Sequence, residues 1–336
     1  MVKNLKMTIH SARSLWFALA FACTPKKPEK NEVSKTNAID FLTAREIAPA
    51  AETPDCKEDE ADRIFSLLAF AVVQKDWQEE GNRKPRGHNI GGILVETIDK
   101  VVKNRPQDLP KVQRDDICKK ATIGSYKIRH WARNSNHITC NGTNHGEVRL
   151  MTQYLGQVDR LTQGLDDDKE LSGFTIYTTL EPCVMCSGMM MQQSVDRTVY
   201  GQTDFDFGKA IERMSFDFSQ ASDSEGRSGF KPFPRLTQSE ASKLPLRFDI
   251  DKAYLEVNPA DGDRKEGMTS FLRSGKAKAF YDRAVEELKN YKLHFPENAS
   301  VLADAQKYLA EVVPVLDPLL DPSKVPNEIA TKECKN

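Results

Sequence analysis

TNHGE at residues 143–147 and TLEPCVMC at residues 179–186 are the two stretches of this sequence that decide its fold. The first stretch offers the imidazole of His145 and, two residues later, the carboxylate of Glu147. The second offers two thiols three residues apart, and residues at that spacing share one face of a helix. Imidazole and thiolate groups are ligands that zinc prefers, so the two stretches together predict a metal site.

Three protein ligands are enough for a catalytic zinc site. His145, Cys183 and Cys186 would leave the fourth tetrahedral position of Zn²⁺ open for water. Zinc turns such a water into a nucleophile near neutral pH. We therefore expect Glu147 to act beside the metal as a proton carrier rather than as a ligand.

Each stretch also has a simpler interpretation. Asn144 with Glu147 three residues later is typical of a helix N-terminus. The pair Cys183 and Cys186 alone fits a redox pair or half of a structural zinc ribbon. The sequence holds no second Cys-x-x-Cys to complete a ribbon, which favours the joint zinc site.

Residues 179–188 (TLEPCVMCSG) resemble the corresponding stretch of bacterial tRNA-adenosine deaminases, and the similarity continues through 196–201 (DRTVYG). The spacing His-x-Glu…Pro-Cys-x-x-Cys is that of the zinc-dependent nucleobase deaminases. The chain is thus similar to the cytidine/deoxycytidylate deaminase superfamily. Guanine deaminases share much of the Pro-Cys-x-x-Cys stretch, so the substrate is less well defined than the superfamily.

The resemblance implies hydrolytic deamination of a nucleobase, most simply adenine or cytosine in RNA or DNA. In that chemistry zinc-activated hydroxide attacks the amine-bearing carbon while Glu147 moves the protons. Two alternatives stay open. The first is a deaminase of a free base, nucleoside or nucleotide, and the second is a catalytically silent zinc-binding interaction module.

Further site residues follow from the resemblance alone. Asn104, in an Asn-Arg-Pro triplet, is expected to bind the substrate, and the backbone of Thr179, Leu180 and Glu181 is expected to complete the pocket. Gly146 departs from the Ala or Val that the family has between ligand and proton carrier. A glycine there keeps the spacing but loosens the start of the helix.

Forty residues separate Asn104 from His145, which is more than a simple loop. We expect this insertion over the mouth of the site, as a lid, a substrate-reading loop or a plug. Residues 100–133 carry ten Lys or Arg against three Asp, which suits either phosphate contacts or a solvated loop. The candidate nucleic-acid contacts are Lys127, Arg129, Trp131 and Arg133, and His130 and His137 are candidate spare ligands.

The 336-residue chain has a formal net charge of −1, so no global field attracts it to nucleic acid. Seven cysteines in an irregular arrangement do not predict a disulfide framework, and Cys140 is expected to be a buried thiol. No segment approaches the length of a transmembrane helix. We expect a cytoplasmic protein, with export or lipid anchoring at Cys23 as the alternative, because residues 15–22 form a short apolar run behind basic residues.

The predicted fold is α/β, a three-layer α/β/α sandwich around a mixed five-stranded sheet, with long insertions and terminal extensions. We expect an N-terminal extension over 1–58, a catalytic domain over 59–292 with insertions at 105–143 and 215–245, and a C-terminal extension over 293–336. By resemblance, a homodimer and a nucleic-acid, nucleotide or nucleobase partner are expected. The predicted elements are helices over 62–78, 145–155, 182–193, 268–291 and 299–312, a hairpin over 90–102, and strands over 174–179, 197–200 and 246–251.

Overall fold

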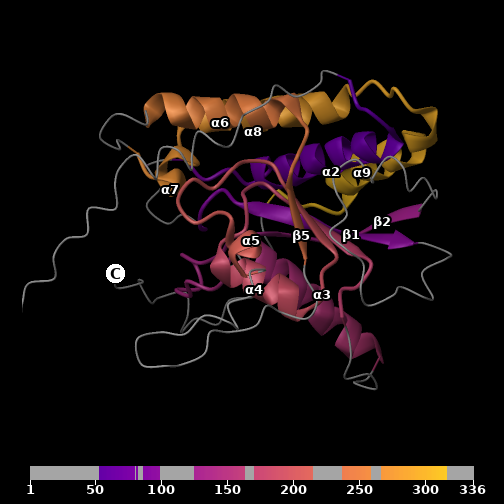
Figure 1. Cartoon of the computed structure of the whole chain (residues 1–336), viewed down its shortest axis with the longest axis horizontal. Coiled ribbons are helices and arrows are strands. Elements are labelled where there is room, and N and C mark those ends of the chain that lie inside the picture. Colours follow the sequence, from indigo (N-terminus) through magenta and orange to yellow (C-terminus); the bar gives the residue numbers. More distant parts are fainter. Residues whose placement is uncertain are drawn as a thin grey trace, which may run out of the picture. The chain divides into compact units, whose positions relative to one another are not determined.

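The computed structural model describes residues 53–79, 81, 86–98, 125–162, 170–214, 237–258 and 266–315, and of 158–162 only the backbone. All of them belong to one compact unit, Glu46–Asn336. Figure 1 shows a sheet with helices on both faces. The expected three-layer α/β/α architecture is confirmed.

A mixed five-stranded sheet forms the middle layer, in the order β2-β1-β3-β4-β5. Strand β1 (Gly91–Ile98) runs antiparallel to both β2 (Ser125–Arg133) and β3 (Phe174–Thr178). Strands β4 (Arg197–Tyr200) and β5 (Gln238–Ala241) continue the sheet in parallel with β3. The carboxyl ends of β3 and β4 therefore lie side by side, and the chain leaves β3 there towards Cys183.

Alternating side chains of the central strands pack into two separate hydrophobic cores. Ile93 and Val95 of β1, with Tyr177 of β3, belong to the core beneath one helical layer. Leu94 and Ile176 point the other way and pack with Cys186, Met190 and other side chains of the second core. This period of two is the one that a sheet covered on both faces requires.

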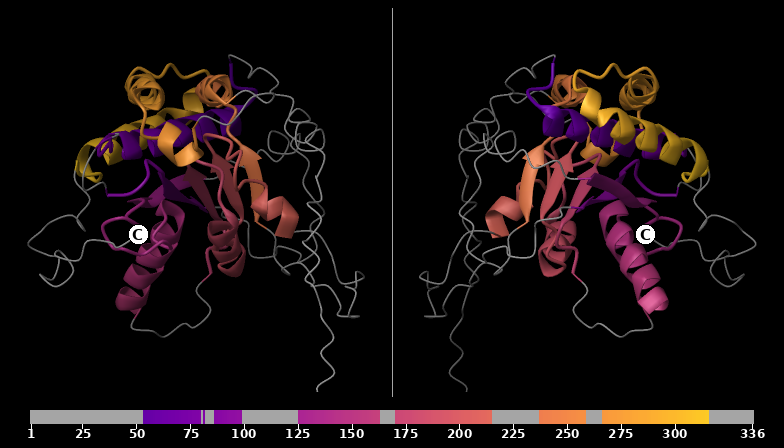
Figure 2. Two further views of the ribbon diagram at one scale, coloured as in Figure 1. Left: turned by 90° about the vertical axis from the view of Figure 1, so that its left-hand side faces the viewer. Right: turned by 90° about the vertical axis from the view of Figure 1, so that its right-hand side faces the viewer.

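The first helical layer consists of α2 (Lys57–Gln74), α6 (Pro245–Val257), α8 (Gly275–Lys289) and α9 (Ala299–Glu311). On the opposite face lie α3 (Gly146–Thr162), α4 (Val184–Gln192) and the short α5 (Ala210–Met214). Figure 2 shows the two layers edge-on. The remaining short elements are α7 (Met268–Phe271) and a 3₁₀ turn, η2 (Pro296–Asn298).

Helix α2 begins five residues before the expected position and is buried almost all round. It contacts β1 and β3 on one side and α8 and α9 on the other. Its Glu60 is fully buried and accepts hydrogen bonds from the backbone N–H groups of His294 and Phe295, at 2.6 and 3.1 Å. Residues after 292, expected as an extension, thus pack directly on this helix.

The expected hairpin over 90–102 is wrong in its second strand. Strand β1 continues unbroken to Ile98, and its antiparallel partner β2 comes from residues 125–133, inside the expected insertion. The hairpin connection is therefore long, and residues 99–124 lie outside the described part of the chain. Arg129 is the extra residue of a bulge, since Leu94 pairs with His130 and Val95 with Ile128.

The expected strand over 246–251 is wrong, because these residues form the first half of α6. Leu246, Ile250 and Tyr254 are buried at a spacing of four, and Pro245 occupies the start of the helix. The fifth strand is instead β5, four residues within the expected 215–245 insertion. The expected helix over 268–291 is divided into α7 and α8, whose N-cap Ser274 accepts a hydrogen bond from the N–H of Ala277.

Cys56 and Cys140 each take part in a disulfide bond. Cys140 is exposed and has a positive φ of 48°, so the expected buried thiol is wrong. Among the described helices, none is both long and apolar enough to cross a membrane.

Candidate functional site

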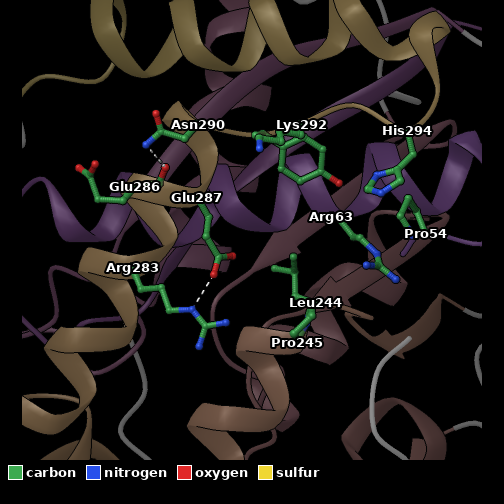
Figure 3. A pocket seen from close by; sticks show the side chains of 11 residues that line it. Pro54, Arg63, Leu244, Pro245, Arg283, Glu286, Glu287, Asn290, Lys292 and His294 are labelled. Carbon is green, nitrogen blue, oxygen red and sulfur yellow. Dashed lines mark hydrogen bonds and ion pairs between the residues drawn. The ribbon is translucent and has the colours of Figure 1, made fainter. Parts of the chain in front are cut away.

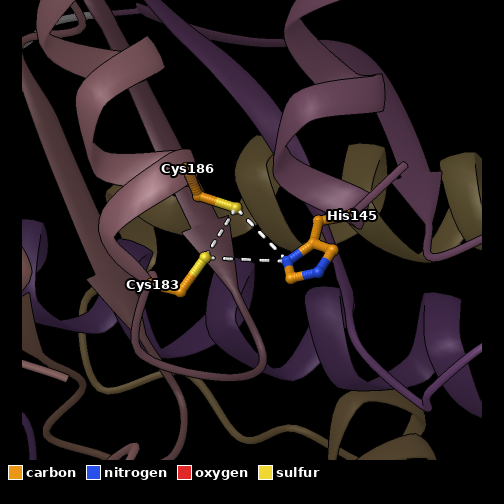
Figure 4. Close-up of side chains that lie close together, drawn as sticks. All are labelled: His145, Cys183 and Cys186. Carbon is orange, nitrogen blue, oxygen red and sulfur yellow. Dashed lines mark hydrogen bonds between the residues drawn. The ribbon is translucent and has the colours of Figure 1, made fainter. Parts of the chain in front are cut away.

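Three side chains come together at the start of α3 and α4 (Figure 4). We call these three, His145, Cys183 and Cys186, the ligand group. The Nδ1 atom of His145 lies 3.7 Å from Cys183 Sγ and 3.6 Å from Cys186 Sγ, and the two sulfur atoms are 3.6 Å apart. No other group of three or more His, Cys, Asp or Glu side chains converges in this way within the described residues.

These distances fit a tetrahedral zinc ion. Zinc bound at about 2.3 Å to sulfur and about 2.0–2.1 Å to nitrogen places two sulfur ligands about 3.8 Å apart and a sulfur and nitrogen ligand about 3.6 Å apart. The three measured edges lie within about 0.2 Å of those values. A redox pair would need no third ligand, whereas here an imidazole nitrogen completes the triangle.

Backbone geometry holds the three ligands in place. His145 immediately precedes α3, Cys183 is the N-cap residue of α4, and Cys186 is fully buried inside that helix. Hydrogen bonds from the Cys186 thiol and from His145 lower the pKa of Cys183 to about 4, against the effect of burial. A thiolate at the start of a helix is the form that a metal binds.

Glu147 lies beside the ligand group and is buried. Its Oε2 atom is 3.5 Å from Cys186 Sγ, and its Oε1 atom accepts a hydrogen bond of 2.9 Å from the Thr178 hydroxyl at the end of β3. Burial raises the pKa of the Glu147 carboxyl, while the charge of His145 and the hydrogen bond from Thr178 oppose that effect. The carboxylate is thus fixed in a position next to the ligands.

Gly146 allows α3 to approach β1 closely. A Cβ atom at this position would lie 2.8 Å from the Cα of Gly91 and 3.3 Å from the backbone oxygen of Ile90. An alanine would therefore force the start of α3 or the Gly91 backbone to shift. The departure from the family pattern therefore accompanies tight packing of the ligand-bearing turn against the sheet.

Asn134, which sequence reasoning missed, anchors the same turn. It follows β2 directly, is fully buried, and its Oδ1 accepts a hydrogen bond from the N–H of Gly146. Asn104, the asparagine that the sequence singled out, lies outside the described residues. The signal for Asn134 is structural, because its role depends on where β2 ends.

Several buried polar atoms beside this turn find no hydrogen-bond partner among the described residues. They are His88 Nδ1, Asn134 Nδ2, Ser135 Oγ and Asn136 Oδ1. Burial and the neighbouring charges of His137 and His145 lower the pKa of His88 to about 4, so its imidazole is neutral at pH 7. Two segments, residues 86–90 and 134–137, thus present polar atoms next to the ligand group.

Thr179, Leu180 and Glu181 lie between β3 and the first cysteine, and all three are buried. Thr179 exchanges hydrogen bonds with Gly91, accepting from its N–H at 3.3 Å and donating its own N–H to the Gly91 carbonyl at 2.9 Å. Glu181 accepts from the N–H groups of Asp204 and Lys209. The Thr179 and Glu181 side chains therefore make structural contacts.

The four candidate nucleic-acid contacts, Lys127, Arg129, Trp131 and Arg133, lie on β2 at the edge of the sheet. Lys127 is exposed, Arg129 pairs with Glu96, and Trp131 is partly buried. Arg133 is fully buried and donates to the Val72 carbonyl at 2.6 Å, so it is not a surface contact, contrary to expectation.

The candidate spare ligands, His130 and His137, are not part of the ligand group. His130 Nε2 lies 3.1 Å from Gln153 Oε1, and His137 contacts His88 edge-to-face. Neither belongs to the converging ligand set of the described residues.

A hollow of about 500 Å³ lies in the other helical layer (Figure 3). Leu244, Pro245, Tyr291 and His294 line it, and Arg283 at its rim pairs with Asp249 and Glu287. The sheet separates the α2, α6 and α8 layer from α3 and α4, so this hollow is not the site of the ligand group.

The sheet order, the His-x-Glu…Pro-Cys-x-x-Cys motif and the ligand geometry define a deaminase-type α/β protein. The chain matches the family model of MafB19-like deaminases over residues 99–225, which is less than half of its length. These findings place it in the cytidine deaminase-like superfamily.

Two curated relatives are tRNA-specific adenosine deaminases. The one from Haemophilus influenzae is 40% identical over 42 residues, 12% of this chain and 24% of that protein. The one from Rickettsia bellii is 26% identical over 91 residues, 26% of this chain and 63% of that protein. In both cases the match spans less than two thirds of the relative.

Solved structures of deaminases align at low overall scores. A chain from a study of A-to-I editing by tRNA:A34 deaminases has a TM-score of 0.31 at 17% identity, with 55% of this chain and 96% of that chain covered. Guanine deaminase from Bacillus subtilis has a TM-score of 0.28 at 13% identity, with 61% and 97% covered. The fold of the present chain is defined by its own sheet order.

Proposed function

We propose that this chain is a zinc-dependent hydrolase that removes the exocyclic amine of a nucleobase. The observation that carries the proposal is the triangle of His145 Nδ1, Cys183 Sγ and Cys186 Sγ, with a buried carboxylate from Glu147 beside it. A purely structural zinc site would need no such carboxylate. The presence of Glu147 beside the ligands, held by a hydrogen bond from Thr178, therefore supports a catalytic site over a silent zinc module.

His145, Cys183 and Cys186 would hold the metal, and Glu147 would move the protons. Zinc, when bound, would supply the Lewis acidity that activates a water for attack on the amine-bearing carbon. Glu147 Oε2 faces the ligand group, so it can carry the two protons of the attacking water in turn, the first to a ring nitrogen of the base and the second to the departing amine. The balance is one water consumed, one carbonyl formed and one ammonia released.

Thr178 and Asn134 would act by positioning. The Thr178 hydroxyl holds one carboxylate oxygen of Glu147, which leaves the other directed at the ligands. Asn134 fixes the turn that carries His145 and leaves its Nδ2 hydrogens available. We infer that Asn134 Nδ2 and His88 Nδ1 contact polar atoms of the substrate, which would satisfy groups that are otherwise buried without partners.

For the substrate, adenine or cytosine in RNA or DNA remains the first choice. The two relatives named tRNA-specific adenosine deaminases support testing adenosine in RNA first. A free base, nucleoside or nucleotide is the alternative substrate class. The expected homodimer stays a prediction.

The disulfides of Cys56 and Cys140 bear on location. Disulfides persist in oxidising compartments and are rare in the cytosol. They support export rather than the cytoplasmic expectation, and an intact mass of the protein isolated from its native cell, with and without a reductant, tests this.

Deamination measured by mass spectrometry tests the proposal. Zinc-loaded protein is incubated with tRNA, single-stranded RNA and DNA, nucleosides, nucleotides and free bases, in parallel with Glu147→Gln. Exchange of an amine for a carbonyl raises the product mass by about one unit. We expect conversion by the wild type and none by the variant; a variant as active as the wild type, or no conversion of any substrate, would contradict the proposal.

A further inference from the structure

Two apolar side chains are exposed beside the ligand group. Phe207 is 63% exposed in the turn after β4, and Val184 is 58% exposed as the first residue of α4, directly after Cys183. Phe207 is the one exposed phenylalanine or tryptophan ring among large hydrophobic side chains in the described part of the chain. Exposing a phenyl ring to water does not help folding, because burial of apolar surface is what stabilises the folded state.

The turn that carries Phe207 is fixed by hydrogen bonds. Asp204 Oδ1 accepts from the N–H groups of Asp206 and Phe207, at 2.9 and 3.0 Å. Lys209 N donates to Glu181 Oε1 at 2.8 Å, and a Cβ on Gly208 would lie only 2.3 Å from Glu181 Oε2. Phe207 therefore projects from a rigid backbone rather than from a loose loop.

The same contacts place the turn at the site. Glu181 is two residues before the ligand Cys183, and its carboxylate accepts the N–H groups at both ends of the turn, from Asp204 and Lys209. Phe207 and Val184 thus lie on two segments that border the ligand group.

The carboxylates of this turn are directed at backbone groups. Glu181 and Asp204 accept the hydrogen bonds described above, and Asp206 Oδ2 lies 3.5 Å from the N–H of Met268. The exposed feature of the turn is consequently apolar and aromatic. A flat apolar face on a rigid support is what a nucleobase stacks on, whichever base it is.

We propose that Phe207 stacks on an unpaired base adjacent to the target base in a single-stranded nucleic acid. This inference rests on the proposed function, since it assigns that site a polymeric substrate. A free-base enzyme gains nothing from an exposed ring at the rim of its pocket. A polymer gains affinity there from each neighbouring base that stacks.

Binding of a ten-residue oligouridylate tests the inference without any reaction, because uracil has no exocyclic amine. We expect Phe207→Ala to weaken binding about 5- to 150-fold, the range found for loss of one base–aromatic stack. Val312→Ala, which truncates an exposed side chain at the end of α9 in the other helical layer, is the matched control and should bind like the wild type. The salt dependence of binding should be the same in Phe207→Ala and the wild type, since no phosphate contact is removed.

Phe207→Trp supplies a second readout that does not depend on affinity. Its added tryptophan fluorescence, relative to the wild type, should be quenched at saturating oligouridylate. The inference is overturned if oligouridylate does not bind, if Phe207→Ala binds as tightly as Val312→Ala, or if the tryptophan signal does not change. Deamination of monomers with no oligouridylate binding would refute this inference and leave the proposed function intact; Phe207-dependent binding with no deamination of any substrate would do the opposite.

Discussion

Thr178→Val removes the hydroxyl that donates to Glu147 and that also lies 3.4 Å from the Gly91 carbonyl oxygen. The hydroxyl donates to Glu147 Oε1 at 2.9 Å, and both side chains are buried, at 2% and 3% exposure. Valine has nearly the same shape as threonine, so packing is preserved while a buried carboxylate oxygen loses its donor. A hydrogen bond to a charged group contributes about 1.5–3 kcal/mol.

We expect the free energy of unfolding to fall by about 1.5–3 kcal/mol in Thr178→Val. If the same positioning acts in the reaction, kcat should fall about 10- to 150-fold. Urea denaturation and the mass-spectrometric deamination assay measure the two quantities. The loss of kcat should not be rescued by more substrate, because substrate binding is not what the change removes.

Thr198→Val is the matched control, with the same substitution on the neighbouring strand. Thr198 is also fully buried, but its hydroxyl donates to the neutral carbonyl of Ile176, at 3.2 Å. We expect a cost of about 0.5–1.5 kcal/mol and an unchanged kcat. The positioning argument would be refuted if the two variants lost activity equally, or if Thr178→Val remained fully active.

Three further predictions concern the scaffold. Burial raises the pKa of Asp204 to about 6, so the folded protein binds a proton that the unfolded chain has released; stability from this carboxyl is complete below pH about 4 and is lost as the pH rises through 6. The free energy of unfolding of Asp204→Asn, measured by urea titration, should therefore rise relative to that of the wild type by up to about 3 kcal/mol between pH 4 and 7. Wild type and variant with the same pH dependence of this free energy would contradict the prediction. Arg133→Met should lower the free energy of unfolding by about 3–5 kcal/mol, because it leaves buried partners unpaired. Lys127→Ala should change it by less than about 0.5 kcal/mol, because Lys127 is exposed. Equal melting temperatures of these two variants would refute the placement of Arg133. Leu246→Ala should cost about 2–5 kcal/mol and Phe248→Ala clearly less, since a helix buries the first and leaves the second half-exposed, while a strand would bury both alike.

The ligand group was predictable because its chemistry is local. His145 and Glu147 stand two residues apart, and Cys183 and Cys186 share a helical turn, so four residues at fixed spacing define the centre. The strands on either side of α4 in the sequence, β3 and β4, are short, β-branched and apolar, and their bounds agree closely with expectation.

Strand pairing at a distance was not predictable in the same way. After Ile98 the sequence continues with Asp99 and Lys100 and then Val101 and Val102, a pattern that resembles a tight hairpin, while the true partner β2 begins only at Ser125. Strand β5 is a polar edge strand, QSEA, with no apolar alternation to mark it. Nearby, Leu246 and Ile250 satisfy both a strand and a helix pattern, and Pro245 together with tertiary packing decides for the helix.

Residues outside the motif followed the same division. Asn134 reaches the site only because β2 ends beside the start of α3, a consequence of pairing across the sheet. Arg133, one residue earlier, points into the interior instead. The expected insertion over 105–143 contained both residues, and nothing in the sequence alone marked which of them would face the interior.

Metal content tests the central claim most directly. Protein purified without chelator is analysed for zinc by mass spectrometry, in the wild type, Cys186→Ala, His145→Ala and the control Thr198→Val, with circular dichroism to confirm folding. The geometry predicts one zinc per chain in the wild type and the control, and little or none in the two ligand variants. Folded Cys186→Ala or His145→Ala protein that retains a full equivalent of zinc, or a folded wild type that binds none when zinc is supplied, would contradict the assignment of this centre.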